Sequence, residues 1–205
     1  MRERAWNRSE AMTLLDPSER RRAGEMPERL WARLGLRRGE TVVDVGAGSG
    51  FYSFPAAARV GPTGHVFAVD VSSDLVELLR SRADEKKVGN LEAVLSTATR
   101  IPLEDAVADV AILANLLHGI PSRTVDETIR VLRPGGKLVN VDWKKEPSEG
   151  GPAVRHRLSA TMARRVLTSH GLAHVDSFDL GPSHYAQVFE RPRPVRHPGH
   201  LVSAE

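Results

Sequence analysis

Short apolar runs alternate along this chain with segments in which apolar residues recur every three or four positions. Five runs rich in β-branched and other apolar residues predict buried strands, at residues 41–45, 65–70, 91–95, 109–114 and 137–142. Helical spacing between them predicts helices at 52–60, 72–87 and 121–132. Such alternation is typical of a parallel sheet with helices on both faces, so we expect an α/β fold.

The two ends of the chain depart from this pattern. Asp16 and Pro17 open a segment, residues 18–34, that predicts one or two helices. Near the other end a helix is expected at 158–170, followed by two strands that a Gly-Pro turn joins into an antiparallel hairpin, at 172–180 and 184–190. We therefore expect a flexible segment 1–15, one domain over 16–190 with a helical cap at 16–38, and a disordered tail at 191–205.

The most informative stretch joins the first predicted strand to the helix after it, through three alternate glycines in Asp44-Val45-Gly46-Ala47-Gly48-Ser49-Gly50. Glycine allows positive φ and lets a ligand approach the backbone, and the amides of the following helix point toward that ligand. Asp70 ends the second strand, where a carboxylate can accept hydrogen bonds from both hydroxyls of a ribose. The alternative is that Asp70 only caps the next helix. The pattern predicts a nucleotide-type cofactor site.

Two adenosine-containing cofactors fit this loop, a dinucleotide and S-adenosylmethionine (SAM). Asp44 suits the ammonium group of a methionine moiety and would repel a pyrophosphate. Phe51 stands where a dinucleotide fingerprint has its third glycine. These features favour SAM and count against a nicotinamide oxidoreductase.

Two further features accompany the glycine loop: the Val69-Asp70 pair and the segment Leu132-Arg133-Pro134-Gly135-Gly136-Lys137-Leu138. In these three features together, the chain resembles a class I SAM-dependent methyltransferase. Over residues 16–190 it is similar to the small-molecule branch typified by the ubiquinone/menaquinone-biosynthesis methyltransferases (methyltransferase type 11). The resemblance implies a Rossmann-like, doubly wound, seven-stranded sheet that is mostly parallel with an antiparallel last strand. It also implies SAM as the cofactor, held by Asp44, Gly46, Ala47, Gly48, Gly50, Asp70, Val71, Thr97, Ala98 and Asn115. Thr97 stands where family members commonly carry an acidic residue that binds the adenine amine.

Four residues near the carboxyl ends of later strands are candidates for the methyl acceptor's side of the site: His118, Asp142, Trp143 and Tyr185. A histidine is the commonest general base, and an aromatic wall suits a flat or cationic substrate. Each also has a purely structural interpretation, as a helix-terminus histidine or an ordinary core aromatic. His156 and Arg157 could reach the site as part of a lid.

Composition narrows the classes of function. The chain has no cysteine, which excludes disulfides and cysteine metal sites, and argues against an arsenite methyltransferase. We expect no metal. The net charge of +3 is concentrated at the termini without interleaved aromatics, which disfavours nucleic acid. No apolar run approaches the about 20 residues of a membrane span, and no signal peptide is evident, so the expected compartment is the cytoplasm.

The sequence therefore predicts a SAM-dependent methyltransferase acting on a small molecule at carbon, oxygen or nitrogen. An RNA or protein methyltransferase that uses the basic termini remains an alternative, as does a SAM-binding protein without transferase activity. The sequence leaves the oligomeric state and the identity of the acceptor open.

Overall fold

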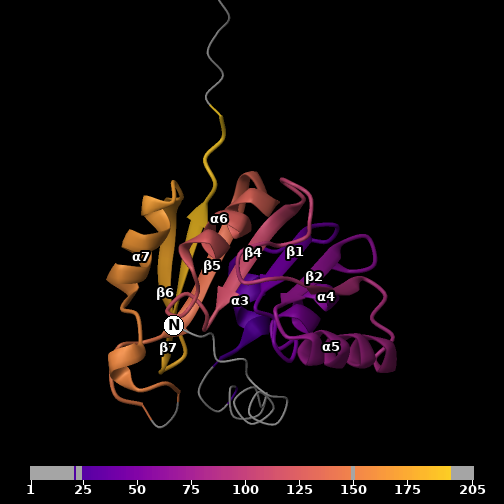
Figure 1. The fold of residues 1–205 in the computed structure, drawn as a ribbon, viewed down its shortest axis with the longest axis horizontal. Coiled ribbons are helices and arrows are strands. Elements are labelled where there is room, and N and C mark those ends of the chain that lie inside the picture. Colours follow the sequence, from indigo (N-terminus) through magenta and orange to yellow (C-terminus); the bar gives the residue numbers. More distant parts are fainter. Residues whose placement is uncertain (1–20, 22–24, 149–150, 195–205) are drawn as a thin grey trace, which may run out of the picture.

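Seven strands form one mixed sheet in the computed structural model, which describes residues 21, 25–148 and 151–194 (Figure 1). The strand order is β3-β2-β1-β4-β5-β7-β6. The strands are β1 (Thr41–Val45), β2 (His65–Asp70), β3 (Leu91–Leu95), β4 (Ala108–Ala114), β5 (Leu132–Trp143), β6 (Ala173–Leu180) and β7 (His184–Glu190).

The order of the strands reverses beside β1. Both neighbours of β1 run parallel to it, β2 on one side and β4 on the other. The chain therefore leaves the carboxyl ends of β1 and β4 in opposite directions, which opens a crevice at that edge of the sheet. β7 runs antiparallel to both β5 and β6, so the expected fold class and its antiparallel hairpin are confirmed.

Alternate residues of each strand face opposite layers of helices. Val42 and Val66 pack with the cluster under α3 (Pro27–Arg33), α4 (Ser53–Val60) and α5 (Ser73–Glu85), whereas Val43 and Val69 pack with the cluster on the other side. The second layer contains α6 (Ser122–Val131) and α7 (Ala160–Ser169), and the short helix η1 (Val154–His156) precedes α7. The core thus has two apolar layers, one on each face of the sheet, as period-two alternation requires.

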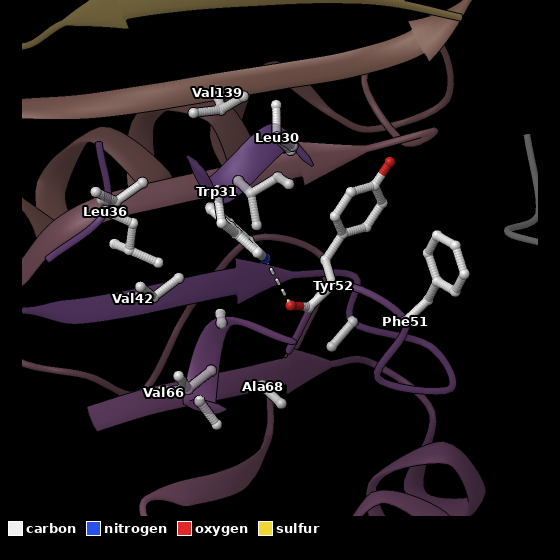
Figure 2. Close-up of a cluster of buried hydrophobic side chains, with 14 of the residues drawn as sticks. Leu30, Trp31, Leu36, Val42, Phe51, Tyr52, Val66, Ala68 and Val139 are labelled. Atoms are coloured by element: carbon white, nitrogen blue, oxygen red, sulfur yellow. Dashed lines mark hydrogen bonds between the residues drawn. The ribbon is translucent and has the colours of Figure 1, made fainter. Parts of the chain in front are cut away.

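Helix α3 has only seven residues, too few to be stable in isolation, so its packing holds it in place. Leu30 and Trp31 are 0% and 1% exposed. The Trp31 indole Nε1–H donates to the backbone oxygen of Tyr52 at 3.1 Å, and both rings lie in the cluster shown in Figure 2. This anchor brings the segment before α3 close to the loop that follows β1. The expected N-cap Asp16 and the segment 1–15 lie outside the described residues.

Two expectations need correction. The Pro134-Gly135-Gly136 segment was expected as a turn before a strand at 137–142, but it is a bulge within the longer β5, because Leu132 already pairs with Ala108. Arg191, assigned to the tail, is bonded to the fold: its guanidinium donates to the carbonyls of residues 129, 130 and 132. The ordered domain therefore extends past residue 190, and residues 195–205 lie outside the described part.

Candidate functional site

The glycine loop after β1 is closed by backbone hydrogen bonds to β2. The amides of Gly46 and Ala47 donate to the Val69 oxygen at 2.8 and 3.0 Å. Gly46, Gly48 and Gly50 have φ values of +72°, +56° and +83°, which side chains rarely adopt. A Cβ on Gly46 would lie 2.8 Å from Leu116 Cδ2, a side-chain end that can rotate away, so the positive φ is the main reason for glycine there.

Asp70 ties the end of β2 to this loop. Its Oδ2 accepts a hydrogen bond from the Gly48 amide at 2.9 Å, and its Oδ1 accepts one from the Ser72 amide at 3.0 Å. Each carboxylate oxygen can accept a further bond, so the group can both shape the loop and bind two ribose hydroxyls. The side chain is 7% exposed, and burial raises the pKa of this carboxyl.

Asp44 is fixed to helix α4. It is 2% exposed, and its Oδ2 accepts a hydrogen bond from the Ser53 hydroxyl at 2.6 Å. The contact orients the carboxylate between β1 and the first turn of α4. A carboxylate has about four acceptor positions, so the hydrogen bond from Ser53 is compatible with the expected role toward an ammonium group.

Exposed apolar side chains flank the ends of β2 and β3. Val71 is 60% exposed and Leu95 is 48% exposed, although both adjoin buried strands. Thr97 forms a backbone bridge with Arg100, and the Ala98 carbonyl accepts a hydrogen bond from the Thr124 hydroxyl. An aromatic base placed at this edge would cover apolar surface that is otherwise in water.

His118 and Asp142 form a pair at the carboxyl edge of β4 and β5. The Nδ1 of His118 lies 3.3 Å from Oδ2 of Asp142, whose side chain is completely buried. The hydrogen bond to Asp142 raises the pKa of His118, and burial opposes it. The sequence predicted both residues but not their contact.

Tyr185 and Trp143 are held by their neighbours. The Tyr185 hydroxyl donates to the Leu158 oxygen at 3.1 Å, and burial raises the pKa of this phenol. The Trp143 ring lies 4.1 Å from the His184 ring, and the Arg157 guanidinium lies 5.0 Å from it. A Cβ on Gly151 would come 2.6 Å from the Trp143 ring, so this aromatic is closely covered by protein.

The four acceptor-side candidates do not share one face of the sheet. Asp142 and Tyr185 are register partners on the face that α6 and α7 cover, and His118 joins them there. Trp143 follows Asp142 in the same strand and therefore points to the opposite face, with His184. The sequence predicted one group of four side chains at this edge of the sheet, but they form two groups, one on each face. The alternation rule for strands could have revealed this.

A cluster around Glu25 was not expected. Its carboxylate accepts hydrogen bonds from the Tyr52 hydroxyl at 2.8 Å and from Nδ2 of Asn115 at 3.2 Å, and lies 3.6 Å from His184 Nε2. Asn115 has a φ of +56°, and its Oδ1 is buried without a hydrogen-bond partner among the described residues. No local pattern marks Glu25, because its place depends on how the segment before α3 packs.

Arg157 anchors the loop after β5. It is 4% exposed, and its guanidinium donates to the carbonyls of Pro152, Lys144 and Glu146 at 2.7, 3.1 and 2.8 Å. This side chain therefore holds the loop together rather than reaching into the site as part of a lid. His156 lies in the neighbouring helix η1 and is exposed.

Neither a metal-binding cluster nor a membrane-spanning helix occurs in the part of the chain that the structure describes. Among residues 21, 25–148 and 151–194, no group of three or more His, Cys, Asp or Glu side chains is arranged to hold a metal ion. In the same part of the chain, no helix has both the length and the apolar character needed to cross a membrane.

Comparison with known proteins identifies the family. A family described as "Methyltransferase domain" matches residues 36–186. An arsenite methyltransferase of Halobacterium salinarum is 38% identical over 106 residues, which cover 51% of this chain and 27% of that protein. A ubiquinone/menaquinone biosynthesis C-methyltransferase, UbiE, of Ectopseudomonas mendocina is 33% identical over 125 residues, which cover 57% of this chain and 49% of that protein. The chain thus spans half or less of the length of these relatives.

Solved structures agree with this assignment. A SAM-dependent methyltransferase from Aquifex aeolicus superposes with a TM-score of 0.85 and 28% identity, covering 91% of this chain and all of that one. A geranyl diphosphate methyltransferase in complex with SAM superposes with a TM-score of 0.69 over 92% of this chain and 93% of that one; at 17% identity it shows the fold alone. The match over residues 36–186 and these structures together place the chain in the methyltransferase domain family, among the class I methyltransferases whose cofactor is SAM.

Proposed function

We propose that this chain transfers a methyl group from SAM to a small-molecule acceptor. The observation that carries the proposal is the Asp70 carboxylate, which reaches across the carboxyl edge to the Gly48 amide within a glycine loop of this family. The strand order reverses beside this loop, where doubly wound sheets bind their ligands.

The residues present fit the cofactor. Asp70 would accept hydrogen bonds from the ribose hydroxyls, and the positive-φ glycines leave the backbone of residues 46–50 open to the ligand. Val71 and Leu95 would lie against the adenine, with Thr97 in place of an acid as a hydrogen-bonding group. Asp44 would face the ammonium group. When bound, the cofactor supplies a methyl group on a positively charged sulfur.

His118 is the proposed general base for an acceptor that must lose a proton. Its side chain is 24% exposed, so it lies at the surface of the site rather than within the core. Asp142 binds Nδ1, which leaves Nε2 as the atom that takes the proton. Because Asp142 raises the pKa of His118, the free base forms at a higher pH than for an ordinary histidine.

The relatives support a small molecule as the acceptor. Quinone precursors are implied by the name of the UbiE relatives, and arsenite by the name of the Halobacterium relative. Arsenite binds thiolates, and this chain contains no cysteine, so arsenite is excluded from the proposal. A small carbon, oxygen or nitrogen acceptor remains.

The test has two steps. Calorimetric titration of the wild-type chain with SAM, S-adenosylhomocysteine and NAD should show binding of the first two and none of NAD. Incubation with labelled SAM and fractionated metabolite extracts, RNA and protein should then label a small molecule. Binding of NAD without SAM would overturn the proposal, and label in RNA or protein alone would replace the acceptor class. An Asp70→Ala variant, whose cofactor binding should be weakened, serves as the control.

A further inference from the structure

A buried carboxylate spans the crevice where the strand order reverses. Glu25, just before α3, is 0% exposed. Its Oε2 accepts hydrogen bonds from Tyr52, which follows the loop after β1, and from Asn115, which follows β4. One side chain thus joins both walls of the crevice, and its Oε1 faces His184 at the start of β7.

The bonding pattern favours the ionised form of this carboxyl group. A tyrosine hydroxyl and an amide N–H both donate to the same oxygen, and donors to a carboxylate stabilise its charge. Helix α3 fixes the position of the charge, because Leu30 and Trp31 lock the segment against the sheet (Figure 2). Complete burial opposes the charge, and the two donors offset that cost, so Glu25 is a carboxyl group held in place by packing and poised to carry a negative charge.

The position of Glu25 along the sheet edge from Asp70 indicates which part of a bound cofactor its charge would face. With the ribose bound at the end of β2, the rest of an adenosine cofactor extends along the sheet edge toward β1 and β4. Glu25 is bonded to residues that follow those two strands. Its contact with His184 places it on the same face of the sheet as Trp143, the face that α3 and α4 cover.

We infer, resting on the function proposed above, that the charge of the buried Glu25, acting across Tyr52 and Asn115, selects for positive charge at the methyl-donor end of the ligand. SAM carries a sulfonium there, and S-adenosylhomocysteine carries a neutral thioether. A fixed carboxylate binds the charged form more tightly, so the spent cofactor leaves more readily than a fresh one.

The experiment compares three ligands by calorimetry: SAM, S-adenosylhomocysteine, and sinefungin, a SAM analogue with an amine in place of the methylated sulfur. Glu25→Gln keeps the size of the side chain and removes its charge. We expect the variant to lose about tenfold in affinity for SAM and sinefungin, as for a unit charge several ångströms away in a partly shielded site. Affinity for S-adenosylhomocysteine should stay within about twofold.

Glu28→Gln is the matched control. It removes a carboxylate three residues later along the chain, but Glu28 is 56% exposed and pairs with Arg21, so all three affinities should be unchanged. An equal loss for all three ligands in Glu25→Gln, or no loss, would overturn the inference. If Glu25→Gln fails to fold by circular dichroism, Glu25→Asp keeps the charge and should keep the preference for SAM; loss of that preference would also overturn it. A wild-type chain that binds none of the ligands would refute the proposed function instead.

Discussion

The pair formed by His118 and Asp142 makes the stability of this protein depend on pH. The interaction raises the folded-state pKa of His118 above its unfolded value. The stabilisation is therefore fully present below the unfolded pKa of about 6.5, and it is lost as the pH rises through the higher folded value. Asp142→Asn removes the charge with little change in shape, and His118→Gln removes the titrating ring.

The size of the effect follows from the geometry. A hydrogen bond to a charged group contributes about 1.5–3 kcal/mol, and a neutral one about 0.5–1.5 kcal/mol. The 3.3 Å separation is long, so the lower end of the charged range applies, although Asp142 is completely buried. The coupling energy of a double-mutant cycle should be about 1.5 kcal/mol near pH 5.5 and about half of that near pH 9.

Urea unfolding of the wild-type chain, both single variants and the double variant measures this coupling at each pH. The pair His170 and Asp126 provides a matched control, because its contact is 2.7 Å but Asp126 is 48% exposed. Its coupling should stay below about 1 kcal/mol. A coupling for His118 and Asp142 that is zero, or that does not change between the two pH values, would refute this reasoning.

Three further predictions concern the site and the end of the domain. Asp70→Ala should weaken SAM binding by about 1.5–3 kcal/mol in calorimetry, and unchanged binding would mean that Asp70 only shapes the loop. Because burial raises the pKa of Asp70, the affinity of the wild-type chain for SAM should fall on acidification at a higher pH than for an ordinary aspartate. Arg191→Ala should lower the free energy of unfolding by about 1.5–3 kcal/mol in urea, because three carbonyls lose a charged donor, while the exposed Arg193→Ala should not. His118→Ala should lower turnover of the identified acceptor by about 10²-fold or more with little change in SAM affinity; full activity would exclude His118 as the base.

Local patterns in the sequence were enough to predict the α/β framework of this fold. The runs that predicted β1, β2 and β3 match the strands residue for residue, because buried parallel strands need largely apolar segments. The run that predicted the antiparallel β7 matches as well. Ser159, within the first turn of the helix expected at 158–170, accepts a hydrogen bond from the Met162 amide as the N-cap of α7. The glycine loop and Asp70 were likewise readable, since tight turns with positive φ leave few residue choices.

The tertiary structure decided which distant side chains meet. Asp142 and Trp143 are adjacent in sequence yet belong to different groups, since strand geometry sends them to opposite faces and the helices on each face choose their partners. Arg191 is bonded only because three carbonyls at the end of α6 and the start of β5 converge on it.

Glu25 shows most clearly what a local sequence pattern cannot predict. Nothing near it in the sequence distinguishes it from Glu28, three residues later on the same segment. One is completely buried across the crevice and the other pairs with an arginine at the surface. The difference arises from the burial of Leu30 and Trp31, which sets the rotation of the segment, and long-range packing of this kind has no signature in a local pattern.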